Sequence, residues 1–256
     1  MNKFLSDMFS LDDKVAIVTG GNTGLGLAYS KALMEAGANL IVTIFDDDIK
    51  EVEEYAKKCN RKVEFVKGDL IKKECRQEVI SKALEVYGKI DILVNNAGTI
   101  RRAPLLEYTE KDYNDVININ MNALYFLSQE VAKVMVEAGH GKIINIASML
   151  SYQGGKFVPA YTASKHAVMG LTKAFANELA CKNIQINAIA PGYIKTANTK
   201  PIRDDKKRNE EILNRIPAGK WGETIDLMGT VIFLASNASN YVNGFTIAVD
   251  GGWLSR

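Results

Sequence analysis

The stretch Val15-Ala16-Ile17-Val18-Thr19-Gly20-Gly21-Asn22-Thr23-Gly24-Leu25-Gly26 joins a short apolar run to a glycine-rich turn. The run is rich in β-branched residues, which is typical of a buried strand. Residues Leu27 to Ala36 have a helical pattern, and Gly37 ends it. A strand, a glycine-rich turn and a helix in this order predict a phosphate-binding turn, since glycines admit a ligand close to the backbone and the helix start offers free N–H groups. A tight turn without a ligand is the alternative.

Apolar runs and helical patterns alternate along the whole chain. This alternation predicts an α/β fold of the Rossmann type, a doubly wound parallel sheet of about seven strands with helices on both faces. No linker, repeat or low-complexity segment interrupts it, so we expect one domain over residues 1–256. The expected strands are Lys14–Thr19, Asn39–Phe45, Lys62–Lys67, Ile90–Val94, Lys142–Ala147, Ile184–Ala190 and Thr246–Val249, and the expected helices are Leu25–Ala36, Ile49–Lys58, Lys72–Tyr87, Glu110–Glu137 and Pro159–Ala180.

The composition excludes several classes of protein. Apolar residues make up 47% of the 256 residues, and the net charge of +2 gives no reason to expect nucleic acid or a membrane surface as a partner. The segment Met1–Lys14 carries three aspartates and no sustained apolar core, which argues against a signal peptide. No apolar run approaches the ~20 residues that cross a bilayer. The three cysteines lack metal-binding spacing, so we expect reduced thiols, a cytoplasmic protein and no metal site.

The stretch Tyr161-Thr162-Ala163-Ser164-Lys165 places a phenol and an ammonium group four residues apart. On a helix both side chains point the same way. A cation beside a tyrosine favours the phenolate and lowers its pKa from about 10. The pair therefore predicts proton exchange with a hydroxyl or carbonyl of a substrate. An ordinary helix that carries a tyrosine and a lysine is the alternative.

Two further segments depart from a regular pattern. The expected helix Glu110–Glu137 contains four asparagines, which predict a distortion near Asn118–Asn122 because their side chains compete for backbone groups. A charged segment at about residues 194–216 follows the end of a strand, where ligands bind in open α/β sheets. It predicts a substrate lid. Outward-facing asparagines and a solvated surface helix are the respective alternatives.

Taken together, the glycine turn, the mid-helix asparagine, a serine at a strand end and Tyr-x-x-x-Lys resemble the short-chain dehydrogenase/reductase superfamily. The resemblance covers essentially the whole chain. Thr19-Gly-x-x-x-Gly-x-Gly26 matches the coenzyme turn of that family, and Asn95-Asn96-Ala97-Gly98 follows the fourth expected strand. Ser148 follows the fifth strand, thirteen residues before Tyr161.

The resemblance implies a division of roles. Tyr161 would be the acid/base, Lys165 would lower its pKa and bind the nicotinamide ribose, and Ser148 would hold the substrate oxygen. Asn120 would anchor a water linked to Lys165. A homotetramer joined through the two long helices and the C-terminal strand is also implied. The implied coenzyme contacts are Gly20, Asn22, Thr23, Gly24, Leu25, Gly26, Asp46, Asp69, Leu70, Asn96, Ala97, Gly98, Tyr161, Lys165, Pro191, Gly192, Ile194 and Thr196.

The choice between NAD and NADP depends on the end of the second strand. NAD-binding members of the family usually carry an acidic residue there, whereas this chain has Ile44 at the aligned position and Asp46 two residues later. NADP-binding members usually place a lysine or arginine nearby for the 2′-phosphate. Here Asn22, Thr23 and Phe45 carry no charge, and the run Asp46–Asp48 would repel a phosphate. We therefore expect NAD rather than NADP.

Three segments narrow the resemblance: Asn145–Gly155, Arg215–Gly222 and Tyr241–Trp253 are similar to members that act on open-chain sugar acids in uronate and pectin breakdown. This implies NAD-dependent interconversion of a hydroxyl and a ketone, most plainly on 2-dehydro-3-deoxy-D-gluconate, with the reacting carbon, C3 or C5, left open. Gluconate and 3-oxoacyl thioesters are alternative substrates, and a nucleotide-sensing regulator is the non-enzymatic alternative.

A sugar acid requires a cation for its carboxylate group. Arg101 and Arg102 follow the Asn95–Gly98 motif, and we expect one of them to bind the carboxylate. Gln153 lies between Ser148 and Tyr161 and is expected to face substrate hydroxyls. The expected substrate-binding set is therefore Ser148, Arg101, Arg102, Gln153 and Tyr161.

Overall fold

Seven parallel strands form the centre of the computed structural model, which describes residues 3–255. The strand order is β3-β2-β1-β4-β5-β6-β7. The predicted α/β sheet of the Rossmann type is confirmed, and every expected strand begins and ends within two residues of its observed bounds. Residues 1, 2 and 256, at the ends of the expected domain, lie outside the described residues. The strands are β1 (Val15–Thr19), β2 (Asn39–Ile44), β3 (Val63–Lys67), β4 (Ile92–Asn95), β5 (Gly141–Ile146), β6 (Ile184–Pro191) and β7 (Thr246–Val249).

The central strands are apolar on both faces because helices cover both. In β1 all five residues are buried. Ala16 and Val18 pack into the hydrophobic cluster on one face of the sheet, and Ile17, which points the opposite way, packs into the cluster on the other. The continuous apolar run that predicted a buried strand thus reflects two hydrophobic cores separated by one sheet.

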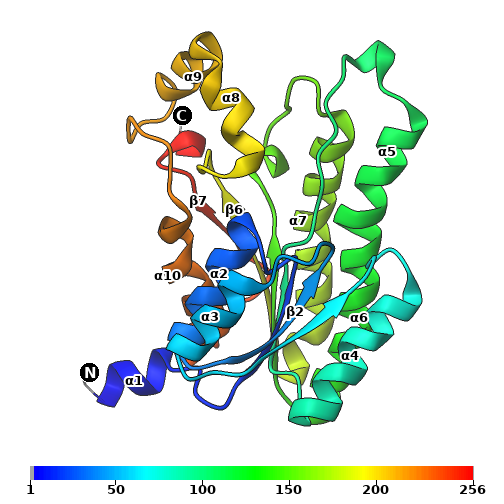
Figure 1. Ribbon diagram of the computed structural model, residues 1–256, viewed down its shortest axis with the longest axis vertical. Helices are drawn as coiled ribbons and strands as arrows, with labels where there is room; N and C mark the ends of the chain where they lie inside the picture. Colours follow the sequence, from blue (N-terminus) through cyan, green and yellow to red (C-terminus); the bar gives the residue numbers. More distant parts are fainter. Residues whose placement is uncertain (1–2, 256) are drawn as a thin grey trace.

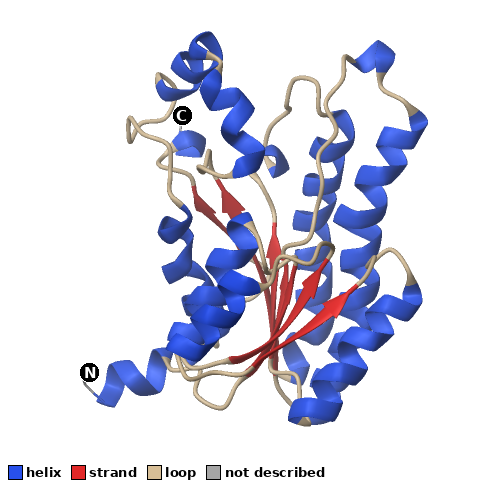
Figure 2. Ribbon diagram, viewed as in Figure 1, coloured by secondary structure: helices blue, strands red, loops and turns tan. Residues whose placement is uncertain are grey.

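Helices lie on both faces of the sheet (Figures 1 and 2). One face carries α2 (Gly24–Glu35), α3 (Lys50–Lys58) and α10 (Met228–Ala235). The other face carries α4 (Lys73–Tyr87), α6 (Leu124–Ala138) and α7 (Pro159–Leu179). Among residues 3–255, no helix combines the length and the apolar character needed to cross a membrane.

Four α-helices of residues 3–255 were not among those expected from the sequence, namely α1 (Lys3–Phe9), α8 (Lys200–Asp204), α9 (Lys206–Leu213) and α10. The sequence of α10 is Met-Gly-Thr-Val-Ile-Phe-Leu-Ala, a short run that is apolar almost throughout. Periodicity cannot assign such a run to a helix or a strand. Its packing against α2 in the core decides that it is a helix.

The order of the strands reverses between β1 and β4, which are neighbours in the sheet. In doubly wound sheets the ligand binds outside the carboxyl ends of the strands at such a reversal. The glycine turn follows β1 at this edge. The helices α8 (Lys200–Asp204) and α9 (Lys206–Leu213), which belong to the expected lid, lie beyond the carboxyl ends of β6 and β7 (Figure 1). The fold therefore gathers the sequence motifs at one edge.

Candidate active site

The glycine turn is shaped to admit a ligand close to the backbone. Gly20 has a positive φ of 60°, and its N–H donates to Thr43 Oγ1 at 3.1 Å. A Cβ at Gly26 would lie 2.0 Å from the Gly20 carbonyl oxygen, so only glycine allows α2 to pack against the turn. Thr23, the N-cap of α2, makes no side-chain capping bond. The N–H groups of the first helical turn are therefore left for an anion, which fits the diphosphate of a dinucleotide.

The loop after β4 is fastened to this turn. Asn96 Nδ2 donates to the carbonyl oxygens of Thr19 at 2.9 Å and Gly20 at 3.1 Å. The backbone N–H groups of Asn96 and Ala97 both donate to Thr19 Oγ1 at 2.9 Å. The Asn95–Gly98 motif therefore holds the carboxyl ends of β1 and β4 together.

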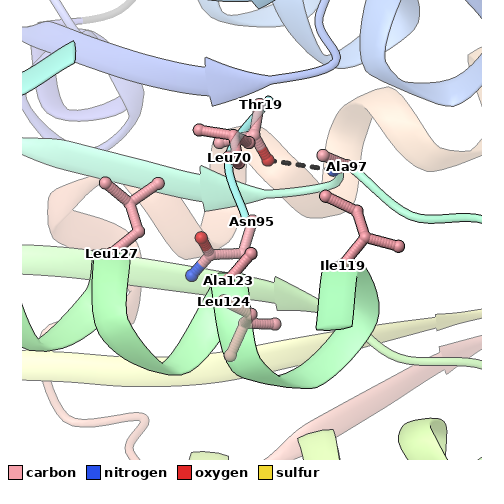
Figure 3. A pocket seen from close by; sticks show the side chains of 8 residues that line it. All are labelled: Thr19, Leu70, Asn95, Ala97, Ile119, Ala123, Leu124 and Leu127. Atoms are coloured by element: carbon pink, nitrogen blue, oxygen red, sulfur yellow. Dashed lines mark hydrogen bonds between the residues drawn. The ribbon is translucent and has the colours of Figure 1, made fainter. Parts of the chain in front are cut away.

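A cavity of about 10 Å³ lies beneath this loop, between β4 and the helical segment that leads into α6 (Figure 3). It has the room of about one water molecule and not of a base. Leu70 and Ala97, two of the expected coenzyme contacts, are among its lining residues. The lining is formed by Thr19, Leu70, Asn95, Ala97, Ile119, Ala123, Leu124 and Leu127.

An acidic group is held at the outer rim of the glycine turn. Buried Asn22 donates through Nδ2 to Asp46 Oδ1 at 2.7 Å and to the Asp48 carbonyl oxygen at 3.1 Å. The neighbouring Asp47 pairs with Lys67 Nζ at 2.7 Å. The carboxylate of Asp46 is thus oriented by the turn itself, which the sequence did not reveal.

The expected contacts after β6 complete this edge. A Cβ at Gly192 would lie 2.5 Å from Asp250 Cα, so the chain passes close to the end of β7 without a side chain. Ile194 is buried in the core, and its carbonyl oxygen accepts a bond from Thr199 Oγ1 at 2.7 Å, so its contact with a coenzyme stays a prediction. Thr196 is the N-cap of the short helix η5 (Ala197–Thr199), and its carbonyl oxygen accepts a bond from Arg203 Nη2 at 3.0 Å.

Ser148, Tyr161 and Lys165 come from two elements. Ser148 is 8% exposed, follows β5, and caps the short helix η3 (Met149–Ser151) by accepting a bond from the Leu150 N–H at 3.1 Å. Tyr161 and Lys165 lie one turn apart on α7, with Lys165 Nζ 5.6 Å from the centroid of the Tyr161 ring. Lys165 is 5% exposed and donates to the Ile146 carbonyl oxygen at 2.5 Å. The end of β5 thus holds the amine in place.

The electrostatics of the pair differ from the expectation. Burial raises the pKa of the Tyr161 phenol, while the hydrogen bond with Ser148 and the positive charge of Arg102 act to lower it. Burial also lowers the pKa of the Lys165 amine to about 8. Desolvation of the phenol outweighs both of these effects, so its pKa is raised overall, and the lowering of that pKa by Lys165 stays a prediction. The structure presents a neutral phenol, which is a proton donor.

Asn120 lies in the π-helical segment η2 (Asn118–Ala123), between α5 (Glu110–Ile117) and α6. The predicted distortion at Asn118–Asn122 is confirmed. Asn120 is 1% exposed, and its Oδ1 accepts from the Thr99 N–H at 2.8 Å. Its Nδ2 donates to the Thr99 carbonyl oxygen at 3.0 Å and to Ser164 Oγ at 3.1 Å. Asn120 therefore ties the loop after β4 to the helix of Tyr161, and its role toward a water stays a prediction.

Two serines that the sequence analysis missed position the catalytic groups. Buried Ser151 donates to the Lys165 carbonyl oxygen at 2.6 Å and accepts from the Ser148 N–H at 3.3 Å. Ser164 donates to the Tyr161 carbonyl oxygen at 2.8 Å. The available signal was their spacing, since each serine lies three residues after a catalytic candidate.

The two candidate arginines differ in their surroundings. Arg101 donates to Thr99 Oγ1 at 3.0 Å and lies 3.7 Å from an oxygen of Asp112 and 3.5 Å from one of Asp115. Its charge is therefore compensated from α5. Arg102 is instead a cation that acts on the Tyr161 phenol. Binding of a substrate carboxylate by one of these arginines stays a prediction.

The expected lid packs over the catalytic serine loop. Ile212 and Ile216 share a buried cluster with Met149, the residue after Ser148, and with Trp253. Gln153 accepts a bond from Arg215 Nη2 at 2.9 Å, and the Arg215 guanidinium lies 4.0 Å from the centroid of the Trp253 ring. Gln153 therefore joins the η3 loop to the end of this segment, and its contact with a substrate stays a prediction.

A family model described as Enoyl-(Acyl carrier protein) reductase matches residues 20–254. Together with the glycine turn, Ser148 and the Tyr161–Lys165 pair, this match defines the class of protein. The chain belongs to the short-chain dehydrogenase/reductase family of oxidoreductases, whose members use a nicotinamide dinucleotide.

Relatives narrow the class to enzymes of sugar acids. The chain is 54% identical to the 2-dehydro-3-deoxy-D-gluconate 5-dehydrogenase of Bacillus subtilis, over 99% of each chain. It is 52% identical to the enzyme of the same name from Dickeya dadantii, over 97% of this chain and 98% of that one.

Solved structures agree over the whole chain. A protein of Agrobacterium tumefaciens with bound NADP is 45% identical, with a TM-score of 0.91 over 98% of this chain and 100% of that one. The gluconate 5-dehydrogenase of Burkholderia cenocepacia, in complex with NADP and tartrate, is 36% identical, with a TM-score of 0.92 over 98% of this chain and 99% of that one.

Proposed function

We propose that this protein is an NAD-dependent dehydrogenase that interconverts the hydroxyl and the ketone at C5 of 2-dehydro-3-deoxy-D-gluconate, in the breakdown of uronates and pectin. The observation that carries this proposal is the grouping of Ser148 with the Tyr161–Lys165 pair at the end of β5. Arg102, an exposed cation whose charge acts on the Tyr161 phenol, is proposed to bind the substrate carboxylate. The names of the relatives at 52–54% identity support the choice of substrate.

The residues of the chain divide the chemistry between them. In the reducing direction, the neutral Tyr161 gives its proton to the carbonyl oxygen of the substrate, and in the oxidising direction the phenolate takes that proton back. Ser148 steadies the same oxygen, and the Lys165 ammonium group favours the phenolate that forms. The nicotinamide ring supplies the hydride chemistry when it is bound.

NAD is the proposed coenzyme because Asn22 holds the Asp46 carboxylate at the rim of the glycine turn. A carboxylate there accepts hydrogen bonds from the hydroxyls of the adenosine ribose and repels a 2′-phosphate. Lys67, a cation that could meet such a phosphate, is paired with Asp47. The two solved relatives described above carry NADP, so the preference needs a direct test.

Asp46→Ser is expected to lower the ratio of kcat/KM for NAD⁺ to kcat/KM for NADP⁺ by about 10–100-fold. This change corresponds to the free energy of a hydrogen bond to a charged group. Asp48→Ser is the matched control, because Asp48 contacts Asn22 only through its backbone oxygen. Initial rates with both coenzymes test this. An unchanged ratio in Asp46→Ser, or an equal change in the control, contradicts the role of Asp46.

The assembly and the lid belong to the same proposal. We propose a cytoplasmic homotetramer, joined through the helices α5–α6 and α7 and the C-terminal strand, as the family resemblance implies. Phe126 on α6 is 44% exposed, which leaves apolar surface for such an interface. We also propose that residues 194–216 cover the substrate, because they pack on the loop of Ser148.

The function is tested by oxidation of 2-dehydro-3-deoxy-D-gluconate and gluconate with NAD⁺ and NADP⁺, and by reduction of the corresponding ketones. We expect NAD-linked turnover, highest for the 2-dehydro-3-deoxy acid. A preference for gluconate or for a 3-oxoacyl thioester would replace the proposed substrate. Tight binding of NADH with no turnover of any of these compounds would favour a nucleotide-sensing regulator.

A further inference from the structure

A second cavity lies at the opposite edge of the sheet, among the amino ends of β4, β5 and β6. Its volume is about 190 Å³, which is the space of about six water molecules in the liquid. Lys142 in this cavity and Ser148 at the catalytic edge are six residues apart along β5 and its extension, or about 20 Å at the rise of a strand. The lining of the cavity includes Lys14, Asp91, His140, Lys142 and Asn240.

The carboxylate in this cavity, Asp91, is already shared among several partners. It is 2% exposed and accepts bonds from the Val15 N–H at 2.9 Å and from Lys14 Nζ at 3.2 Å. His140 Nε2 lies 2.8 Å away and Lys89 Nζ 3.6 Å away. Burial by itself would raise the pKa of Asp91, but these contacts together hold it below its usual value. Asp91 is therefore ionised, and its charge is committed to groups other than Lys142.

Lys142 is a buried ammonium group with no countercharge. It is 8% exposed and donates to Asn240 Oδ1 at 2.8 Å and to Ser239 Oγ at 3.3 Å, both neutral acceptors. Among residues 3–255 no carboxylate lies within ion-pair distance of Lys142, and its third N–H has no acceptor. Burial, and then repulsion from Lys14, lowers the pKa of Lys142 to about 8.

We propose that this cavity is a binding site for a small oxyanion of the sulfate or phosphate type, held between Lys142 and Lys14. The lining carries two lysines and one carboxylate, so its net charge favours an anion. A buried ammonium group without a partner is costly, and a charge-assisted hydrogen bond from an oxyanion removes that cost. The third N–H of Lys142 is free to make this bond.

The experiment measures anion binding to the full-length protein, with sulfate and phosphate titrated against chloride at constant ionic strength. The thermal unfolding midpoint reports binding, because a ligand that binds the folded state raises it with concentration. Calorimetry supplies the dissociation constant. We expect sulfate to raise the midpoint of the wild-type protein in a saturable way that chloride does not reproduce. A rise that does not saturate, or none at all, overturns the site.

Two variants locate the bound anion. Lys142→Met is expected to weaken sulfate binding by at least about tenfold, the value of a hydrogen bond to a charged group. Lys89→Met is the matched control, because it also removes one positive charge, but Lys89 pairs with Asp91 from outside the lining of the cavity. The dissociation constant of sulfate should differ by less than about twofold between Lys89→Met and the wild-type protein, as expected for an exposed charge in salt. Equal weakening in both variants would reduce the proposal to a general charge effect and overturn it.

Asn240→Asp tests the site without removing the lysine. It keeps the shape of the acceptor 2.8 Å from Lys142 Nζ and supplies the missing negative charge. Sulfate binding should be lost although the folded protein keeps or gains stability. Sulfate binding at wild-type affinity in a folded Asn240→Asp protein would overturn the proposal, and this outcome stays decisive if Lys142→Met does not fold.

The pH dependence distinguishes Lys142 from its neighbours. Lys14, Asp91 and His140 are the charged or titratable groups that face the same cavity. Sulfate keeps its charge near neutral pH, so its affinity should fall as the pH rises through about 8, where Lys142 loses its proton. Affinity that is constant through that pH range would exclude Lys142 as the binding group.

Discussion

Tyr161→Phe is expected to lower kcat by about 10²–10⁴-fold in both directions, the usual contribution of a positioned acid/base. The substitution removes the phenolic oxygen that exchanges the proton and keeps the ring that lies beside Lys165 Nζ. Binding of NADH should remain, because the glycine turn and the loop after β4 are untouched. Steady-state rates and a fluorescence titration with NADH measure the two properties separately.

A matched control removes the same atom elsewhere. Tyr241 is fully exposed, and Tyr241→Phe should keep the wild-type kcat. The assignment fails if Tyr161→Phe retains more than about a tenth of the wild-type kcat, since a proton transfer worth 10²-fold or more would then be excluded. Loss of NADH binding together with turnover would instead indicate that the variant disturbs the site as a whole.

Arg102→Met is expected to raise KM for the sugar acid by about 30–150-fold, which corresponds to the ~2–3 kcal/mol of a hydrogen-bonded contact with a charged group. KM for the coenzyme should stay near its wild-type value. The physical reason is that Arg102 lies where its charge acts on the Tyr161 phenol, so a carboxylate that it binds places the substrate carbon chain beside the proton donor. Arg102 is exposed, and its loss should leave the fold intact.

Arg101→Met separates the two neighbouring arginines. Arg101 is held by Thr99, Asp112 and Asp115, so its substitution should change KM for the sugar acid much less. A larger effect in Arg101→Met than in Arg102→Met would transfer the carboxylate site to Arg101. A neutral ketone of the same chain length is a further control, because Arg102→Met should not weaken its binding if the lost contact is with the carboxylate.

The hydrogen bonds around the catalytic groups explain why the distortion at Asn118–Ala123 is part of the site. In a regular helix the amide of a buried asparagine competes with the backbone. Here the π-helical turn places Asn120 where it bonds to Thr99 and Ser164 at once. Since Ser164 in turn bonds to the Tyr161 carbonyl oxygen, the loop after β4 and the catalytic helix are positioned together.

The fold was predictable because its signals are local. A strand buried on both faces appears as a continuous apolar run, and a glycine turn appears as glycines at fixed spacing, whatever lies elsewhere in the chain. The four asparagines within the expected helix Glu110–Glu137 are a local signal of the same kind, and they predicted the distortion. Among the helices that were not predicted is α10, whose short apolar sequence has no period and depends on its neighbours in the core.

The electrostatic state of each group could not be predicted in this way. The pattern Tyr-x-x-x-Lys correctly placed Tyr161 and Lys165 on one face of a helix, but both pKa values depend on burial, and that of Tyr161 also on Arg102, which is distant in the sequence. The bond between Asn22 and Asp46 joins residues 24 positions apart, and the bonds from Asn120 to Ser164 and from Lys142 to Asn240 span 44 and 98 positions.

The sequence by itself therefore determined the parallel sheet, the glycine turn and the placing of Tyr161 and Lys165 on one face of a helix, because the physical cause of each lies within a few consecutive residues. Only the tertiary structure decided that the charge of Arg101 is compensated by Asp112 and Asp115, how Asp46 is oriented, and that Lys142 is a buried cation without a countercharge. Desolvation and charge pairing depend on which distant segments meet, and the chain acquires them only when it folds.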